Sequence, residues 1–192
     1  MEIDFERDRV VGARQVESPN FDDRPPDAEI DLVVIHGISL PPGRFGEPFV
    51  EALFTNQLNP GAHPYFATIA ALRVSCHLFI DRDGEIVQFV PLRQRAWHAG
   101  DSSLAGRKDC NSHSIGIELE GTDTLPYTDS QYASLVLVLR ALRETFPGIT
   151  PDRIVGHSDV APERKSDPGP AFDWRRLRRE LMEAERAGST QS

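Results

Sequence analysis

Residues 32–36 read LVVIH, a short apolar run that ends in a histidine. Most of its side chains are β-branched, and an unbroken apolar run of this length is typical of a strand that is buried on both faces of a sheet. The stretch that follows, GISLPPGRFGEP at 37–48, is rich in glycine and proline and predicts a loop. We therefore expect a central strand with His36 at its carboxyl end.

Apolar runs of similar character recur along the chain, between segments with helical spacing. Residues 114–121, SIGIELEG, predict a second strand, and residues 74–90 predict a hairpin that turns at Asp83-Gly84. These elements lack the regular alternation of a doubly wound sheet, so we predict a mixed α/β (α+β) fold with a single central mixed sheet flanked by helices. The other expected elements are helices over 48–57 and 64–72, a helix capped by Asp129 that ends before Pro147, a short strand within 153–159 and a helix capped by Asp173.

The length of 192 residues favours one domain, 1–192, with a core of its own. Residues 1–28 are polar and contain several prolines, which predicts an extended amino-terminal arm. Residues 100–113 are polar and predict a long loop, and residues 187–192 are expected to form a frayed tail. No repeat or internal linker interrupts this organisation.

The chain is acidic, with a net charge of −9 and a pI of about 5.1. This argues against a basic face for nucleic acid or anionic lipid. The first residues, MEIDFERDRV, lack the apolar core of a secretory signal, and no apolar run approaches the roughly 18–20 residues of a membrane span. Two cysteines, Cys76 and Cys110, indicate no disulfide framework. We expect a cytoplasmic protein, a monomer by default, that binds neither nucleic acid nor membrane.

Polar residues suited to catalysis stand near the ends of the predicted strands. His36 closes the first strand, Glu118 lies in the second, and His157 closes the late strand, with Lys165 and Asp167 soon after. Neighbouring strands lie about 5 Å apart, so such side chains can converge. Two histidines and one carboxylate suit zinc with a fourth position for water, whose pKa zinc lowers to about 7. A second carboxylate can take the proton of that water, and a lysine can stabilise an oxyanion.

Spacing alone leaves two interpretations open. In the first, His36, His157 and Asp167 hold the zinc ion of an amide hydrolase. In the second, the histidines form ordinary hydrogen bonds at strand ends, and Asp167 begins the turn before Pro168. The stretch 156–174, GHSDVAPERKSDPGPAFDW, contains too many prolines for a helix interior or a central strand, so we expect its polar residues to lie in a loop.

Five long motifs follow one another along the chain: VVIHGISLPPGRFG, LRVSCHLFIDRDGEIVQFVP, RAWHAG, SIGIELEGTDTLPYTDSQY and GHSDVAPERKSDPGPAFDW. Together they resemble the AmpD family, cytoplasmic zinc N-acetylmuramoyl-L-alanine amidases that act on 1,6-anhydro-muropeptides. The resemblance extends from about residue 11 to residue 180. It implies the type-2 amidase fold, one zinc ion (Zn²⁺) per chain and a small muropeptide substrate. The expected reaction is hydrolysis of the amide between the lactyl group of (1,6-anhydro-)N-acetylmuramic acid and L-alanine, in cell-wall recycling.

The resemblance also implies roles for individual residues. His36 matches the histidine of the family's VHNISLPPG motif and would be a zinc ligand. His157 matches the histidine of GHxDIAP and Asp167 the aspartate of KTDPGP, so these would be the other two ligands. Glu118, which matches the glutamate of SIGIELEG, would act as general base, and Lys165 would stabilise the oxyanion.

Substrate contacts are expected from three further residues. Trp97 of the RAWHAG motif can stack on a sugar ring, and Arg73 and Arg107 can pair with peptide carboxylates, because a guanidinium matches the geometry of a carboxylate. His77 is not expected to bind the metal, because a fourth protein ligand would close the zinc site, and we expect it to support the fold or a neighbouring ligand. His63 and His113 are expected to have solvated side chains.

Two other functions are compatible with the same fold. The first is a non-catalytic module that binds peptidoglycan or muropeptides, and the second is a lytic amidase that acts on intact peptidoglycan. The complete ligand set together with Glu118 and Lys165 favours an enzyme over a binding module. The lack of an export signal or of cell-wall-binding repeats argues against a lytic amidase.

Overall fold

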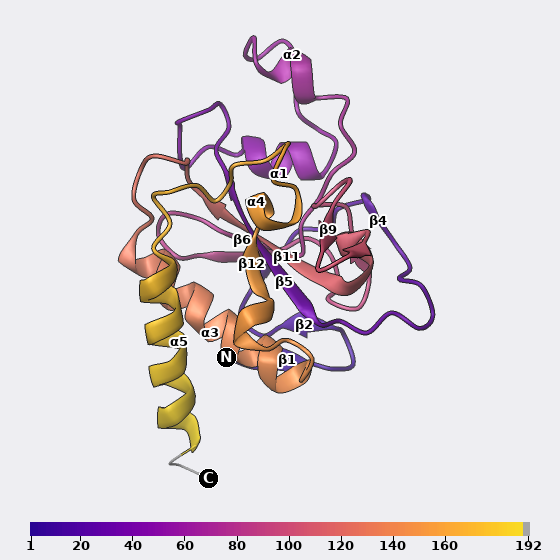
Figure 1. The fold of residues 1–192 in the computed structure, drawn as a ribbon. Coiled ribbons are helices and arrows are strands. Elements are labelled where there is room, and N and C mark those ends of the chain that lie inside the picture. Colours follow the sequence, from indigo (N-terminus) through magenta and orange to yellow (C-terminus); the bar gives the residue numbers. More distant parts are fainter. Residues whose placement is uncertain (190–192) are drawn as a thin grey trace.

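A six-stranded mixed sheet forms the centre of the computed structural model, which describes residues 1–189 (Figure 1). Four neighbouring strands, β12, β5, β11 and β6, run parallel, β7 is antiparallel to β6, and the edge strand β3 is parallel to β7. The predicted mixed sheet is therefore confirmed, as is the hairpin, whose turn contains Gly84 at a φ of 87°. In order across the sheet the strands are β12 (Ile154–Gly156), β5 (Leu32–Ile38), β11 (Ser114–Glu120), β6 (Leu78–Ile80), β7 (Ile86–Gln88) and β3 (Arg14–Gln15).

The register of the central strands brings residues from distant motifs to one edge of the sheet. In the pairing of β5 with β11, His36 lies opposite Glu118. On the other side of β5, Gly156 of β12 lies opposite Ile35. The next residue along the chain, His157, therefore stands at the level of His36. The carboxyl ends of parallel strands are where open α/β sheets bind ligands.

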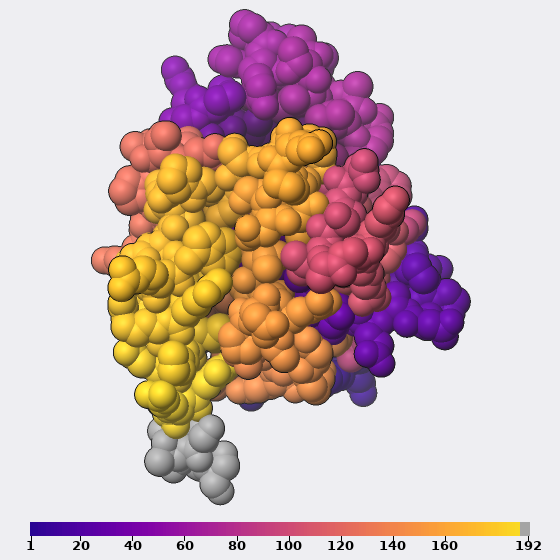
Figure 2. Space-filling model, viewed as in Figure 1, coloured from indigo at the N-terminus to yellow at the C-terminus, as the bar shows by residue number. Residues whose placement is uncertain are grey.

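Two long helices cover one face of the sheet. α3 (Asp129–Thr145) and α5 (Trp174–Ser189) share a core with Val33 and Ile35 of β5. Side chains alternate between the faces of a strand, so His36 points to the opposite face, where a smaller apolar cluster lies. Figure 2 shows α5 along one side of the molecule, next to the segment that leads into it from β12. The helices therefore leave the face that carries His36 open to other segments.

The amino-terminal caps of the two long helices differ from each other in type. Asp129, the predicted cap of α3, lies in the first turn, and Thr128 is the cap. Thr128 Oγ1 accepts from Gln131 N at 3.1 Å and Gln131 Oε1 accepts from Thr128 N at 3.0 Å, a reciprocal capping box. The predicted cap of α5 is confirmed, because Asp173 Oδ1 accepts from Arg176 N at 2.9 Å.

Replacing Thr128 with alanine should lower the free energy of unfolding by about 1 kcal/mol, because the substitution leaves an amide group of the first turn without its acceptor. Urea unfolding measures this change. The exposed neighbour Ser130 offers a matched control, since Ser130→Ala removes a hydroxyl that caps nothing and should change stability by less than about 0.5 kcal/mol. Equal losses in the two variants would contradict the capping box.

Shorter elements occur where the sequence predicts an arm and a loop. α1 and α2 are shorter than the predicted helices, and His157, predicted to close a strand, is the first residue of α4. α5 includes the first part of the predicted tail, and residues 190–192 lie outside the described residues.

Within residues 1–189, no helix combines the length and apolar composition needed to cross a membrane. The short elements are β1 (Ile3–Asp4), β2 (Arg9–Val10), β4 (Phe21–Asp22), β8 (Arg95–Ala96), β9 (Ser103–Leu104), β10 (Arg107–Lys108), α1 (Phe49–Phe54), α2 (Phe66–Ile69), α4 (His157–Val160), η1 (Cys110–His113) and η2 (Pro151–Arg153).

Candidate metal centre and groove

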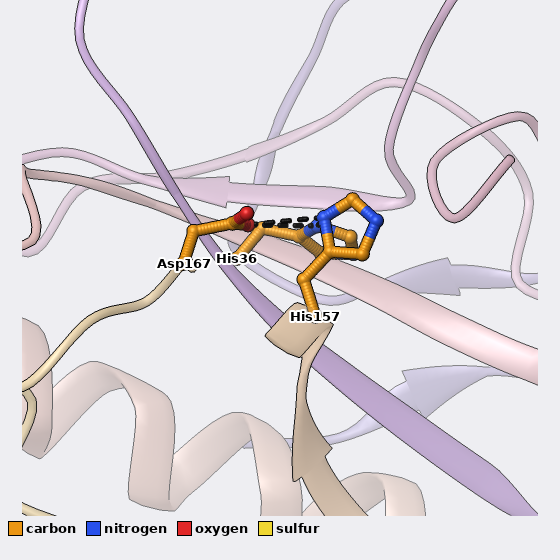
Figure 3. Close-up of side chains that lie close together, drawn as sticks. All are labelled: His36, His157 and Asp167. Carbon is orange, nitrogen blue, oxygen red and sulfur yellow. Dashed lines mark hydrogen bonds and ion pairs between the residues drawn. The ribbon is translucent and has the colours of Figure 1, made fainter. Parts of the chain in front are cut away.

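Three side chains, one from the strand motif at 32–36 and two from the stretch 156–174, direct one ligand atom each at a common point (Figure 3). His36 Nδ1 and His157 Nδ1 are 2.8 Å apart, and Asp167 Oδ2 lies 3.3 Å from the first and 3.1 Å from the second. Two atoms that bind one zinc ion tetrahedrally, at about 2.0–2.1 Å each, lie roughly 3.3 Å apart. The observed separations are close to this value, so the three residues can hold one metal ion.

Each of the three side chains is positioned by a different part of the fold. His36 lies in β5, and His157 begins α4 directly after the neighbouring strand β12. The proline-rich loop that carries Asp167 is held against these elements, because the backbone carbonyl of Asp167 accepts from Ser158 N at 3.0 Å. Tyr127 Oη donates to the carbonyl of the next residue, Pro168, also at 3.0 Å. The loop is irregular, but hydrogen bonds fix its backbone at Asp167 and Pro168.

The hydrogen-bond partners of His157 indicate that a positive charge belongs between the three side chains. His157 Nε2 lies 3.3 Å from the carbonyl oxygen of Ala99, which can only accept, so Nε2 carries a proton. His157 Nδ1 then faces Asp167 Oδ2 at 3.1 Å. A ring nitrogen and a carboxylate this close need a proton or a cation between them. Neutral imidazole and carboxylate are ligands that zinc prefers, so the donor set fits this metal.

Burial and neighbouring charges set the protonation states that a metal requires. Burial lowers the pKa of His36 to about 4, although Asp167 acts in the opposite direction. Burial alone would raise the pKa of Asp167, but its contacts with His157 and His36 outweigh burial and hold this pKa well below its ordinary value. At neutral pH His36 is therefore neutral and Asp167 is ionised, as metal ligands must be.

Glu118 and Lys165 lie beside this cluster and line the same groove. Glu118 Oε1 is 3.9 Å from His36 Nδ1, and within residues 1–189 Glu118 Oε2 is buried without a hydrogen-bond partner. Burial raises the pKa of Glu118 well above its ordinary value, with a further contribution from the charge of Asp167, while Lys165 opposes both. A buried carboxylate of this kind can receive and hold a proton.

The groove is bounded by the loop after β5 and by the segment around α2. Glu120 holds this loop on the sheet, because Glu120 Oε1 accepts from Gly46 N at 2.6 Å and Oε2 accepts from Arg82 N at 3.3 Å. The wall of the groove combines polar and apolar side chains. Its residues include Ser39, Leu40, Pro42, Tyr65, Ile69, Leu72 and Thr122.

One buried residue of the site, His98, has no role in the sequence-based prediction. His98 Nδ1 lies 3.0 Å from His36 Nε2, the nitrogen of that ring that points away from the metal position. Burial lowers the pKa of His98 well below its ordinary value, so the ring is neutral. The signal in the sequence is weak, since a histidine between Trp97 and Ala99 in RAWHAG does not indicate which residue it contacts.

The three predicted substrate contacts have different outcomes. Trp97 Nε1 donates to Asp22 Oδ1 at 3.1 Å, and neither residue lines the groove. Arg107 donates to Asp31 Oδ2, also at 3.1 Å, and lies outside the groove as well. The geometry therefore does not support substrate contact by Trp97 or Arg107. Arg73 is exposed and lies between two residues that line the groove, so its contact with substrate stays a prediction.

The other histidines are more enclosed than expected. The structural role predicted for His77 agrees with its contacts, because His77 Nδ1 accepts from Gly116 N at 3.0 Å. The prediction that His113 is solvated is wrong, since its side chain is buried and its Nδ1 lies 3.0 Å from Asp31 Oδ1. His63 is half-buried.

Known sequences that are similar to this chain are described as amidases. A family model described as N-acetylmuramoyl-L-alanine amidase matches residues 26–170. The 1,6-anhydro-N-acetylmuramyl-L-alanine amidase AmpD of Escherichia coli (strain K12) is 60% identical over 174 residues, which are 91% of this chain and 94% of that protein. The protein of the same name from Haemophilus influenzae is 50% identical over 173 residues, or 90% and 94% of the two chains.

The fold of this chain is similar over most of its length to folds seen in solved structures. A crystal structure of a selenomethionine AmpD derivative is 56% identical, with a TM-score of 0.91 over 94% of this chain and 99% of that one. A complex of the amidase AmiD from E. coli with anhydro-N-acetylmuramic acid-L-Ala-D-γ-Glu-L-Lys is 26% identical, with a TM-score of 0.60 over 84% of this chain and 65% of that one.

Proposed function

Because the chain belongs to the N-acetylmuramoyl-L-alanine amidase family, we propose that it is a zinc enzyme that hydrolyses soluble anhydro-muropeptides. The bond cleaved would be the amide between the lactyl group of 1,6-anhydro-N-acetylmuramic acid and L-alanine. The names of the relatives that are 50–60% identical support this substrate, as does the ligand bound to AmiD. A groove with both apolar and polar walls beside the metal ligands is consistent with it.

Three residues would hold the zinc ion: His36, His157 and Asp167. When bound there, zinc supplies a Lewis acid that acidifies a water molecule and polarises an amide carbonyl. Glu118 would take the proton of the attacking water, since its carboxylate is buried 3.9 Å from His36 Nδ1. Glu118 would then give the proton to the amide nitrogen, so that L-alanine leaves as a neutral amine.

Lys165 would stabilise the negative charge that develops on the carbonyl oxygen during attack. Its ammonium group offers hydrogen-bond donors and no acceptor. Lys165 lines the groove, and its charge is close enough to lower the pKa of both Glu118 and His36. These two effects on pKa support a position of the Lys165 ammonium group beside the reacting atoms.

One observation carries the proposal: two buried histidines and the half-buried Asp167 form one cluster, and His157, Asp167 and the buried Glu118 line the same groove. A module that only binds muropeptides needs neither metal ligands nor a general base. We also assign the activity to a cytoplasmic monomer, on the strength of the resemblance to AmpD and of the composition alone.

A comparison of two substrates tests the assigned reaction. The full chain loaded with zinc should release stem peptide from a soluble anhydro-muropeptide more than an order of magnitude faster than from purified intact sacculi, with the product identified by mass spectrometry. Chelation of the metal should stop the release. Faster release from sacculi would favour a lytic amidase, and binding of muropeptide without any release would favour a binding module. Either result would contradict the proposal.

A further inference from the structure

We propose that His98 is a positioning residue that fixes the tautomer of His36, so that the lone pair on His36 Nδ1 faces the metal. The proposal rests on the proposed function, since it takes the metal centre as given. In this role His98 acts on metal binding through His36 and not on the substrate.

The direction of the hydrogen bonds is set at Ser114. Ser114 Oγ lies 2.6 Å from the carbonyl oxygen of Cys110, which can only accept, so the hydroxyl proton points to that carbonyl. Ser114 Oγ is also 3.1 Å from His98 Nε2. Because the hydroxyl proton of Ser114 already points to the carbonyl of Cys110, Ser114 Oγ must accept the hydrogen bond from His98 Nε2. His98 therefore carries its proton on Nε2.

The same reasoning extends from His98 to the metal ligand. With its proton on Nε2, the neutral His98 ring has a lone pair on Nδ1. This atom lies 3.0 Å from His36 Nε2, which must then donate. His36 Nδ1 is left without a proton, 3.3 Å from Asp167 Oδ2. A metal-binding histidine commonly has its outer nitrogen fixed by such a neighbour, which also orients the ring.

The packing around His98 allows its ring little freedom. A Cβ atom at Gly116 would lie only 2.4 Å from His98 Cγ, so the ring rests directly on the backbone of β11. The backbone of this segment is fixed as well, because Asn111 Oδ1 accepts from His98 N at 3.1 Å and from Ala99 N at 2.8 Å. Ala99 in turn supplies the carbonyl that faces His157 Nε2. Residues 98–99 thus contact the outer nitrogen of both imidazole ligands.

Zinc affinity measured on the full chain, by competition with a chromogenic chelator, tests the proposal. His98→Leu keeps most of the volume and removes the acceptor, and it should weaken zinc binding roughly 10- to 100-fold. His98→Asn places an amide oxygen close to the position of Nδ1 and should recover most of the affinity. Ser114→Ala should weaken binding in the same direction by a smaller factor.

His113→Asn is the matched control, because His113 is another buried histidine but contacts Asp31 and none of the ligands. Its zinc affinity should equal that of the parent chain. If the parent chain binds no zinc, the proposed function fails. If the parent binds zinc and His98→Leu binds it equally well, only the role of His98 fails.

A second measurement needs no variant, so it decides the question even if His98→Leu does not fold. Long-range ¹H–¹⁵N spectra of the zinc-loaded chain report which nitrogen of each imidazole carries the proton. We expect protonated Nε2 atoms in both His98 and His36. A proton on His98 Nδ1 would overturn the proposal.

Discussion

Replacing Glu118 with glutamine should lower the turnover of anhydro-muropeptide by roughly 10²–10⁴-fold, while zinc stays bound. The amide has nearly the shape of the carboxylate but cannot take a proton from water. The ligand atoms of His36, His157 and Asp167 do not depend on that proton transfer. Steady-state kinetics and elemental analysis of the same preparation measure the two quantities.

The buried residue Glu120 provides a control on the same face of the same strand. Glu120→Gln keeps an acceptor for Gly46 N and should lose far less activity than Glu118→Gln. Turnover by Glu118→Gln at the parental rate would show that another group accepts the proton. A loss of zinc equal to the loss of activity would show that Glu118 acts on the metal site and not as a base.

Replacing His157 with alanine should remove both zinc and activity. Two ligands would remain, and a catalytic zinc site ordinarily has three protein ligands. The free energy of metal binding is distributed over the ligands, so the loss of one of them should lower zinc occupancy after dialysis to a small fraction of the parental value. Elemental analysis of zinc per chain measures this loss.

His63→Ala is the appropriate control for that experiment, because it removes a histidine that does not belong to the ligand cluster. It should retain the parental zinc content. If His157→Ala also retained zinc at the parental level, the ligand set would be wrong, whatever happened to the activity.

The central strands and the placement of His36 and His157 at one edge of the sheet were predictable because the signals for them are local. The run LVVIH has the composition of a buried strand. The pairing of β5 with β11 then places Glu118 opposite His36. His157 was predictable as a residue at the end of a short strand, although it begins α4. The position of Asp167 could be inferred only with the family motifs, because nothing in its spacing from His157 distinguishes a ligand from an ordinary turn residue.

The interactions that the sequence did not reveal depend on partners far away along the chain. Trp97 contacts Asp22 and Arg107 contacts Asp31, at separations of 75 and 76 residues, and neither Trp97 nor Arg107 lines the groove. His98 is similar, since its contact with His36 spans 62 residues. No local pattern predicts such pairs. The cap at Thr128 was missed for a different reason, because Thr128 and Asp129 are adjacent and both are good capping residues.

Anomalous diffraction at the zinc absorption edge, from crystals of the zinc-loaded chain, tests most directly whether the three side chains share one metal ion. We expect a single strong peak within bonding distance of His36 Nδ1, His157 Nδ1 and Asp167 Oδ2. A peak that contacts only one or two of these atoms, or that lies elsewhere on the chain, would contradict the metal centre and the mechanism built on it.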